Sequence, residues 1–464
     1  MKKYVVLILL LISLMLLTFN LNTAKKESKK EISKIEKILS KPAGITAYTL
    51  NGEKTDLSYN DLISGYEIDS IACKNGTIAT YNNEDNTVSL SNIQMPEYCT
   101  IDFKEKTLIT LYNKILKDNP KVETRTDFST VFTATNTGTL YTATEKNVHN
   151  TSDTTVYYFS GNATNNWVKF GGYYWRIIRT NADGSIRLLF HGTFHDGKGY
   201  LGRSAYWSVD TNPMYSGYMW GISGTLAKNR NNTVESLIKQ YIDNWYDGTR
   251  TITNSTYQTT YTDTAGTTTN KLIKNADYLS TTAVYCSDRN IGKADYFPYS
   301  LTSTFYYAAY YRSKVPTYDC TTPEDAFSAS NENAKLKYPI GLMTYDEITY
   351  AGGYYGSKNT SAWYYQNSLG ESSTGTDYFW TMSPAMWSYE SSSSKYTMVF
   401  KIGGSTGSGK FSLDTVISPF WVRPVISIKT DVLWSKGDGS PENPYEIVYN
   451  WQCASSTKSC TFAF

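Results

Sequence analysis

Six cysteines are the residues of this chain best suited to covalent chemistry. They fall into three pairs that are close in sequence: Cys73 with Cys99, Cys286 with Cys320, and Cys453 with Cys460. The spacing does not fit structural zinc, because no Cys-x2–4-Cys pair occurs and no histidine lies near them. An even number of cysteines without metal spacing is typical of disulfides in an oxidising compartment. Among the possible connectivities we favour pairing in sequence order, because each pair lies within one expected subdomain.

Asp346 and Glu347 are neighbouring carboxylates in the segment TYDEITYAGG. A catalytic pair must face one substrate with its carboxyl groups about 5–10 Å apart, whereas consecutive helical residues point roughly 100° apart. Thr344 and Glu347 instead have the S/T-x-x-E spacing of a capping box, in which the glutamate reaches back to the start of the helix. We therefore predict that Thr344 and Glu347 have a structural role.

Spacing also bears on two kinds of metal site. His191 and His195 have the i, i+4 spacing of a helical zinc pair, but Gly192 and the preceding strand argue against a helix there. Segments 181–185 and 438–442 carry alternating oxygen-bearing side chains around a glycine, yet neither completes a calcium loop with a terminal bidentate glutamate. We expect turns in both segments and no cofactor, with calcium as the remaining alternative.

Arg423 lies inside the apolar segment PFWVRPVISI. A buried arginine needs a partner, because an unpaired buried charge is costly. Asp288 and Asp346 are the partners we consider, which would make Arg423 a structural residue. The alternative is an anion-binding arginine in a cleft.

The composition favours recognition through aromatic rings over recognition through charge. Lys and Arg total 44 against 42 Asp and Glu, a net charge of +2, so we expect no nucleic-acid partner. The chain has 41 Tyr and 11 Trp, whose flat amphipathic rings suit contact surfaces of extracellular β-rich proteins. Exposed aromatic loops are therefore the expected ligand contacts, with core packing as the equal alternative. The candidates are Tyr206, Trp207, Tyr215, Tyr218, Trp220 and Trp363.

The elements that position these residues begin with a predicted three-stranded meander. Its strands, rich in β-branched and aromatic residues and separated by turn residues, are 167–170, 173–179 and 185–190. Neither face of the middle strand is plainly polar, so we expect Trp175 and Arg176 to lie in a central strand covered on both sides. Apolar spacing over 233–246 predicts an amphipathic helix, started by Asn232 with Glu235 and ended by Gly248.

The chain begins with an uncharged run of 18 residues, 4–21. As a helix this run would cover about 27 Å at about 1.5 Å per residue, close to the thickness of a bilayer's hydrocarbon core. We expect residues 1–24 to be an uncleaved membrane anchor, with a signal peptide as the alternative. Lysines flank both ends of the run, so the expected disulfides decide the orientation. The prediction is a single-pass protein of the cell membrane with its C-terminal ectodomain outside, or a secreted protein if the leader is cleaved.

Shifts in composition divide the rest of the chain into five segments. They are an amphipathic stalk helix at 25–42, a small β module with a Cys73–Cys99 disulfide at 43–104, a helix and Thr/Asn-rich linker at 105–154, the main domain at 155–448, and a disulfide loop with an edge strand at 449–464. A module as small as 43–104 has a thin core, so a disulfide contributes much of its stability.

Taken as an ordered set, several motifs resemble an uncharacterised family of bacterial extracellular domains. They are the Gly-Gly-x-x-Trp-Arg strand containing Trp175 and Arg176, the Trp-x-x-Ser-Pro segment that begins at Trp380, and the Val-Arg-Pro strand around Arg423. The resemblance covers about residues 157–448. This family is similar to the C-type-lectin-like fold shared by formylglycine-generating enzymes and variable receptor-binding proteins. The resemblance implies an α+β fold with a twisted antiparallel sheet, a packed amphipathic helix and long loops.

The same resemblance implies recognition without catalysis. The enzyme branch uses a cysteine thiol site near its C-terminal end, whereas Cys286 and Cys320 fall elsewhere and are expected to be paired. We therefore expect a non-catalytic adhesion or recognition protein whose ligand is a glycan, a peptide or a protein. A pilin-like or fibre subunit is the first alternative, because the apolar run continues into the stalk at 25–42. An enzyme of the formylglycine-generating type is the second.

Overall fold

The computed structural model describes residues 45–50, 53–55, 66–82, 87–92, 99–105, 108–196, 199–221, 230–249, 255–261, 272–291, 303–365, 378–403, 409–448, 452–453 and 460–461. The chain divides into two compact units, Met1–Leu108 with Asn450–Phe464, and Ile109–Tyr449. The membrane anchor and the stalk predicted over 1–42 lie outside the described residues. Within the described ranges, no helix is both long enough and apolar enough to cross a membrane.

The smaller unit is built from short strands. Four form a sheet in the order β2-β1-β6-β3, while β4 pairs with β5 and β28 with β29. Their bounds are β1 (Ile45–Leu50), β2 (Glu53–Thr55), β3 (Tyr66–Cys73), β4 (Ile78–Asn82), β5 (Thr87–Ser91), β6 (Cys99–Glu105), β28 (Gln452–Cys453) and β29 (Cys460–Thr461). Cys73 is disulfide-bonded and lies opposite Cys99 in the strand register, as Cys453 lies opposite Cys460. The described residues of 43–104 thus form short strands, as expected for a small β module.

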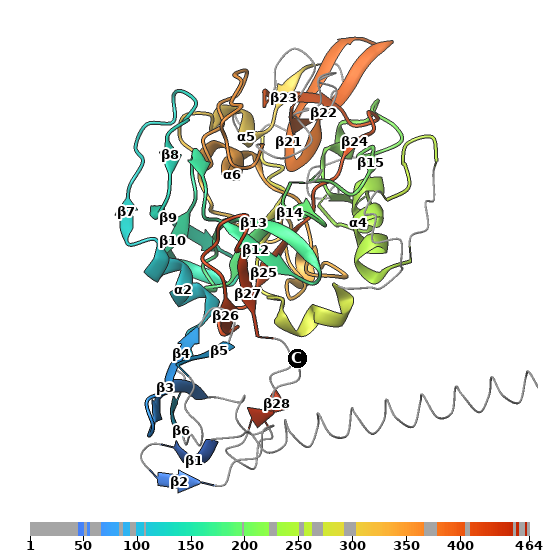
Figure 1. The fold of residues 1–464 in the computed structure, drawn as a ribbon. Coiled ribbons are helices and arrows are strands. Elements are labelled where there is room, and N and C mark those ends of the chain that lie inside the picture. The colour runs from blue at the N-terminus through green and yellow to red at the C-terminus, as the bar shows by residue number, and fades with distance from the viewer. Residues whose placement is uncertain are drawn as a thin grey trace, which may run out of the picture. The chain divides into compact units, whose positions relative to one another are not determined.

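The larger unit contains a nine-stranded sheet with the predicted meander at its centre (Figure 1). The order is β26-β27-β12-β13-β10-β9-β7, and β14 pairs with both β13 and β25. The bounds are β7 (Lys121–Glu123), β9 (Thr139–Asn147), β10 (Asn150–Tyr158), β12 (Trp167–Phe170), β13 (Tyr173–Thr180), β14 (Ile186–Gly192), β25 (Val425–Ile428), β26 (Trp434–Lys436) and β27 (Tyr445–Ile447). Trp175 and Arg176 are buried on β13, which confirms that this strand is central and covered.

The Thr/Asn-rich segment that the sequence predicts as a linker belongs to this sheet. β9 and β10 form an antiparallel pair, and Tyr158 on β10 lies opposite Arg179 on β13. Val156 and Tyr158 are buried, while most other residues of β10 are polar and exposed or partly exposed. The linker prediction for 105–154 is therefore wrong beyond its helix, α2 (Leu111–Asp118). A strand with one short buried stretch is held in place even when its other residues are polar.

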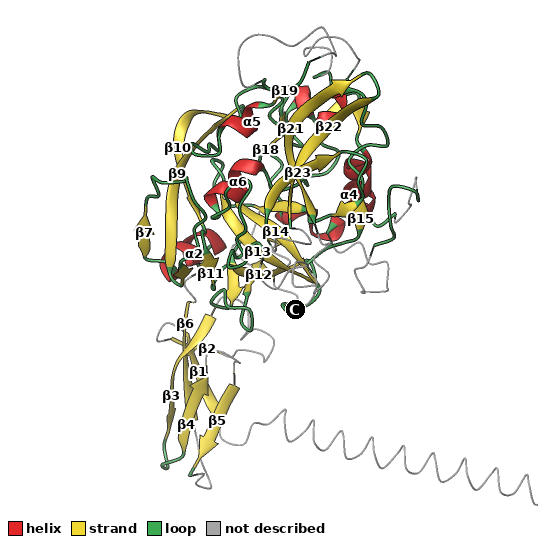
Figure 2. Ribbon diagram, turned by 90° about the horizontal axis from the view of Figure 1, so that it is seen from above, coloured by secondary structure: helices red, strands yellow, loops and turns green. Residues whose placement is uncertain are grey.

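A second sheet has six strands, and the long hairpin of β21 and β22 lies within it (Figures 1 and 2). The order is β15-β24-β21-β22-β23, and β19 pairs with β21. The bounds are β15 (Arg203–Ser204), β19 (Phe305–Tyr306), β21 (Phe379–Ser391), β22 (Ser394–Ile402), β23 (Phe411–Thr415) and β24 (Phe420–Trp421). Two-stranded pairs complete the unit: β8 (Thr135–Asn136) with β11 (Asn162–Ala163), β16 (Met219–Trp220) with β17 (Val234–Glu235), and β18 (Tyr285–Cys286) with β20 (Ala326–Phe327).

Short helices pack against these sheets. They are α4 (Leu237–Asp247), α5 (Ala308–Tyr311), α6 (Tyr345–Tyr350) and the 3-10 turns η1 (Pro213–Ser216), η2 (Ile273–Tyr278) and η3 (Glu332–Ala334). α4 ends at Gly248, whose φ of 80° is the left-handed C-cap that the sequence predicts. Its N-cap is Ser236, not Asn232, because β17 occupies the residues before the helix. The structure is thus a mixed α+β fold that is mostly sheet with few helices, as predicted at this level.

Candidate functional site

The predicted Cys286–Cys320 disulfide is present and lines a small polar pocket in the larger unit. The two Cα atoms are 5.9 Å apart, and the bond closes a segment with a sequence separation of 34. The pocket volume is about 20 Å³, which is space for about one water molecule. Its ionisable lining comes from segments far apart in the sequence: Arg179, Arg187, Arg312, Asp288, Asp319, Asp346 and Glu347.

Glu347 is the central carboxylate of this pocket. Its Oε1 atom accepts hydrogen bonds from Arg179 Nε at 3.1 Å and from Arg187 Nη1 at 2.7 Å. Its Oε2 atom accepts from the Thr344 backbone amide at 2.9 Å, and Thr344 Oγ1 accepts from the Glu347 amide at 3.1 Å. The predicted capping box of α6 is therefore confirmed. Burial raises the pKa of Glu347, but Arg187 and Arg179 lower this pKa more, so that it lies below its ordinary value.

Arg179 also binds a second buried carboxylate. Its Nη1 atom lies 2.5 Å from Glu145 Oε2, and both side chains are buried. No sequence signal singles out Glu145, because the prediction places it in a linker at 105–154. A lone glutamate in a Thr-rich segment is usually solvated, and only the pairing of β9 with β10 brings this one to Arg179.

Arg312 fixes the position of α5 relative to α6. It is the C-cap residue of α5, and its Nε and Nη2 atoms bind the two carboxylate oxygens of Asp346 at 3.1 and 2.8 Å. Its Nη1 atom binds Asp288 Oδ2 at 2.6 Å. Burial lowers the pKa of Arg312, but Asp346 and Asp288 raise this pKa more, so that the net shift is upward. Such a bidentate pair sets orientation as well as distance.

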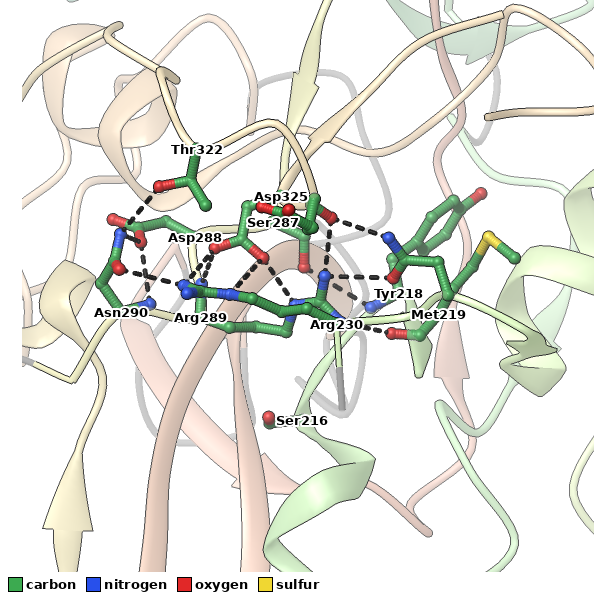
Figure 3. A network of polar contacts seen from close by, with 12 residues as sticks. Ser216, Tyr218, Met219, Arg230, Ser287, Asp288, Arg289, Asn290, Thr322 and Asp325 are labelled. Atoms are coloured by element: carbon green, nitrogen blue, oxygen red, sulfur yellow. Dashed lines mark hydrogen bonds and ion pairs between the residues drawn. The ribbon is translucent and has the colours of Figure 1, made fainter. Parts of the chain in front are cut away.

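Asp288 connects this pocket to a second charged network, which Figure 3 shows. Asp325 there accepts from Arg289 Nε at 2.7 Å and from Arg230 Nη2 at 2.6 Å. Asn290 accepts from Arg230 and donates to Asp288 Oδ1. In both networks the buried carboxylates face arginines, so their charges are compensated. This arrangement is typical of structural ion pairs.

Arg423 does not bind the carboxylates considered for it, because Asp288 and Asp346 bind Arg312. The fully buried Arg423 donates from Nε to the Phe190 carbonyl oxygen at 3.1 Å and from Nη1 to the Tyr364 carbonyl oxygen. Its Nη2 atom has no hydrogen-bond partner among the described residues. Burial lowers the pKa of Arg423 to about 9. The arginine thus links β14 to the segment around Tyr364 through backbone carbonyl groups, as a structural residue would.

The other motif residues are buried and hydrogen-bonded in the core. The guanidinium group of Arg176 lies 4.1 Å from the centre of the Trp167 ring. The indole N–H groups of Trp175 and Trp380 donate to backbone carbonyl oxygens at 3.0 and 2.9 Å. Arg176, Trp175 and Trp380 are thus part of the packed interior of the larger unit.

The candidate metal-binding residues take part in other contacts. His191 is buried, and its Nε2 atom lies 2.9 Å from the His195 carbonyl oxygen. Burial, Arg423 and Arg176 hold the pKa of His191 well below its ordinary value. In segment 181–185, Asp183 accepts hydrogen bonds from Ser185 in a turn. Across the ranges that the structure describes, no group of three or more His, Cys, Asp or Glu residues could hold a metal ion.

Most of the aromatic residues predicted as ligand contacts are buried. Those with at most 7% of their surface exposed are Tyr206, Trp207, Tyr218 and Trp363. Tyr215 and Trp220 keep partial exposure, but their ring centroids are 4.8 Å apart and both pack against the core. A ligand cannot stack on a ring that the fold covers, so core packing is the better interpretation for the four buried residues.

A different set of tyrosines reaches the surface. Tyr306, Tyr310, Tyr311 and Tyr355, which we call the tyrosine face, form a continuous series of ring contacts. Tyr310 lies 4.2 Å from Tyr306, 5.6 Å from Tyr311 and 5.4 Å from Tyr355 between ring centroids. Tyr311 is 46% exposed and the other three are partly exposed. The face combines residues of β19, α5 and the segment after α6.

Core residues hold the tyrosine face in place. The ring centroid of Phe400 on β22 lies 6.5 Å from that of Tyr310 and 5.8 Å from that of Tyr355. Tyr307 is buried, and its hydroxyl donates to the Pro213 carbonyl oxygen at 3.0 Å. The only sequence signal for this face is the spacing of four residues between Tyr306 and Tyr310. This signal does not stand out, because α5 has only four residues and shows no helical period.

Comparisons of this chain with family models, curated proteins and solved structures found no match. The arrangement of side chains is therefore the guide to what the site does. The pocket beside the disulfide holds compensated charges in a very small volume, whereas the tyrosine face offers neutral rings to a ligand.

Proposed function

We propose that this chain is a membrane-anchored extracellular recognition protein that binds its partner through the tyrosine face. The observation that carries the proposal is the series of ring contacts joining Tyr306, Tyr310, Tyr311 and Tyr355 at the surface. Partly exposed tyrosines combine a large apolar area with a hydroxyl group and lose little side-chain entropy on binding. They are among the residues enriched at binding hot spots.

The buried ion pairs support this proposal by their position. Arg312 holds α5 against Asp346 of α6, and Glu347 of the same helix is held by Arg179 and Arg187. Two helices that border the face are thus fixed by charges that are themselves compensated. A face ordered before the ligand arrives binds more tightly, because less side-chain and loop entropy is lost.

The cellular location in the proposal rests on the apolar run at 4–21 and on the cysteines. Cys73 and the Cys286–Cys320 pair are disulfide-bonded, and such bonds persist in oxidising compartments. We place the C-terminal part outside the cell membrane as a single-pass protein, or in the medium if the leader is cleaved. A lectin-like topology for the larger unit is part of the same proposal.

A binding screen with the full chain tests the proposed function. The purified protein is applied to cell surfaces, glycan arrays and protein arrays, and the double variant Tyr310→Ala/Tyr311→Ala is compared with it. We expect at least one ligand whose binding falls about tenfold or more, equal to about 1.4 kcal/mol. Tyr174→Ala, which removes a partly exposed tyrosine from β13 of the other sheet, is the matched control. If Tyr310→Ala/Tyr311→Ala binds every ligand as well as Tyr174→Ala does, the tyrosine face has no role in binding.

A further inference from the structure

Arg176 and Arg423 place two positive charges inside the larger unit. Both side chains are at most 3% exposed, and guanidinium groups stay protonated in proteins. Arg176 donates hydrogen bonds to the Asn166 amide oxygen at 2.7 Å and to the Ala163 carbonyl oxygen at 2.9 Å. Arg423 donates to the two backbone carbonyl oxygens given above. All four acceptors are neutral, so among the described residues no carboxylate compensates either charge.

The two charges lie in the same part of the interior. The guanidinium group of Arg176 lies 4.1 Å from the centre of the Trp167 ring, whose centroid is 4.4 Å from that of the His191 ring. A Cβ atom at Gly199 would lie 3.4 Å from Arg423 Nη2 and 3.5 Å from the His191 Cα atom, so Arg423 reaches the same histidine. Burial, Arg423 and Arg176 all lower the pKa of His191, and burial and Arg423 lower the pKa of Arg176. The two guanidinium groups therefore repel each other.

Two like charges without a counter-charge are unfavourable in a protein interior. Burial removes the water that solvates each guanidinium group, and the low effective dielectric constant of the interior strengthens their repulsion. Buried charges in proteins are usually paired for this reason. A water molecule beside the two groups would supply hydrogen bonds but no charge, whereas an anion supplies an acceptor and a charge. The charge balance therefore favours an anion over water.

One hydrogen-bond donor of the two arginines has no acceptor. Arg423 is fully buried, and its Nη2 atom has no hydrogen-bond partner among the described residues. Because residue 199 is glycine, no side chain of that residue covers this nitrogen, although a Cβ atom there would be at ordinary contact distance. The same Cβ atom would lie 3.1 Å from the His191 carbonyl oxygen. A carbonyl oxygen repels an anion, so the position suits only a small one.

We infer that Arg423 and Arg176 hold one small inorganic monoanion, such as chloride, with Arg423 Nη2 as its donor and Arg176 as the second positive charge beside it. His191 is not a ligand, because its Nε2–H group donates to the His195 carbonyl oxygen at 2.9 Å and its Nδ1 atom then carries a lone pair. Arg176 belongs to β13, and Arg423 lies between β24 and β25, so the anion stabilises the chain where it passes from one sheet to the other. The site shares no residue with the tyrosine face and is independent of the proposed function.

Urea unfolding of the full chain at constant ionic strength tests the inference, with sodium chloride exchanged stepwise for sodium gluconate, whose anion is too large for the site. An anion that binds only the folded chain lowers the unfolding constant about tenfold for each tenfold rise in its concentration above the dissociation constant. We expect this dependence in the transition of the larger unit. Arg423→Gln should abolish it, whereas Arg125→Gln should keep it. Arg125 is the matched control, because it also donates to a backbone carbonyl oxygen, that of Tyr350, but is partly exposed to water.

A second variant and a direct observation separate loss of the anion from a folding defect in Arg423→Gln. Gly199→Ala retains both arginines and places a methyl group 3.4 Å from Arg423 Nη2, so it should also abolish the chloride dependence. Near-ultraviolet circular dichroism checks that each variant is folded. Crystals of the wild-type chain grown in sodium bromide should show an anomalous scattering peak at contact distance from Nη2.

Three results would overturn the inference. The first is equal stability of the wild-type chain in chloride and in gluconate. The second is a chloride dependence that folded Arg423→Gln or folded Gly199→Ala retains. The third is a site beside Nη2 without anomalous signal in bromide, which would mean that water and not an anion accepts this hydrogen bond.

Discussion

At the scale of single residues, the buried arginines of this protein fall into two groups, which differ in the groups that their guanidinium charges contact. Arg179, Arg187 and Arg312 meet carboxylates, and those ion pairs orient α5 and α6. Arg423 and Arg176 instead meet carbonyl oxygens, amide oxygens and aromatic rings. The first group depends on its partners remaining charged, and the second does not.

Replacing Glu347 by glutamine should strongly destabilise the larger unit. The change leaves Arg187 without a carboxylate and removes one of two from Arg179. Breaking a buried pair typically costs roughly 3–5 kcal/mol, and chemical denaturation of the variant measures this loss. Glu332→Gln is the control, because its ion pair with Lys335 is exposed, and we expect a change within about 0.5 kcal/mol. Similar losses for both variants would contradict the central role of Glu347.

His191 should make the stability of the protein depend on pH below about 6.5. Its pKa in the folded state is held well below the ordinary value by burial, Arg423 and Arg176. As the pH falls below 6.5, the His191 imidazole binds a proton in the unfolded chain but not in the folded chain. Stability present above pH 6.5 is therefore lost on acidification, at up to about 1.4 kcal/mol per pH unit.

Urea denaturation between pH 7 and pH 5 measures that dependence. His191→Gln should reduce the slope of unfolding free energy against pH by about one proton, whatever its effect on stability at pH 7. The wild-type protein, denatured under the same conditions, supplies the reference slope. An unchanged slope in His191→Gln would show that the folded protein protonates this imidazole.

Tyr206 allows a test of core packing against ligand contact. Its hydroxyl is buried without a hydrogen-bond partner among the described residues, and its ring lies 5.6 Å from that of Trp380. Tyr206→Phe keeps the ring and removes the unsatisfied group, so the unfolding free energy should rise by about 1 kcal/mol. Ligand binding should be unchanged. A loss of binding without a loss of stability would return Tyr206 to the list of contacts.

The contacts of a residue could be predicted from the sequence where few other residues can act as its partner. The capping box of Thr344 and Glu347 was predictable because both partners lie within one helical turn. The Cys286–Cys320 pair was predictable because cysteines have few possible partners. The partners of Arg423 were not, because they are backbone carbonyl groups that any residue could supply.

At the scale of elements, the segment between Cys286 and Cys320 is the most informative part of the larger unit. It carries β19, α5 and three residues of the tyrosine face, and the disulfide fixes its two ends. Arg312 provides a second attachment through Asp288 and Asp346. The segment is thus held both by a covalent bond and by ion pairs.

Removing the disulfide with Cys286→Ser/Cys320→Ser should cost about 3–4 kcal/mol of unfolding free energy, because a closed segment of this length loses its constraint in the unfolded chain. The ion pairs of Arg312 should keep α5 attached, so ligand binding should weaken less than in Tyr310→Ala/Tyr311→Ala. Denaturant unfolding and the binding titration measure the two effects. Complete loss of binding with little loss of stability would show that the disulfide, and not Arg312, positions the face.

An element could be predicted where its apolar residues recur with the period of a strand or a helix. The meander of β12, β13 and β14 has long apolar and aromatic runs between glycine-containing turns, and it was placed correctly. β9 and β10 have nine residues each and are longer than the meander strands, but polar residues make up much of both, so their strand pattern is hidden in the sequence. α5 is too short for any period to show.

At the scale of the whole molecule, the two compact units differ in how they resist unfolding. The larger unit has an extensive aromatic core, whereas the smaller one is made of short strands with the Cys73 disulfide among them. Small domains bury a smaller fraction of their surface and depend more on covalent cross-links. We therefore expect scanning calorimetry of the full chain to show two transitions.

A reductant should separate these transitions further. It should lower the temperature of the smaller transition by more than that of the larger, because small domains bury a smaller fraction of their surface and depend more on their cross-links. The control is the Cys286→Ser/Cys320→Ser variant, in which reductant should shift only the smaller transition. A single transition with equal sensitivity to reductant would mean that the units unfold as one.

The chain enters and leaves the larger unit beside the same strand. The Trp434 amide of β26 donates to the Ile109 carbonyl oxygen at 2.9 Å, and the Val448 amide donates to the Leu433 carbonyl oxygen at 3.0 Å. Tension applied at these two connections would be borne by a few neighbouring backbone bonds at the sheet edge and would not cross the aromatic interior. Under a mechanical pull, β26 and β27 should peel away first, while α5 and the rings it carries keep their shape.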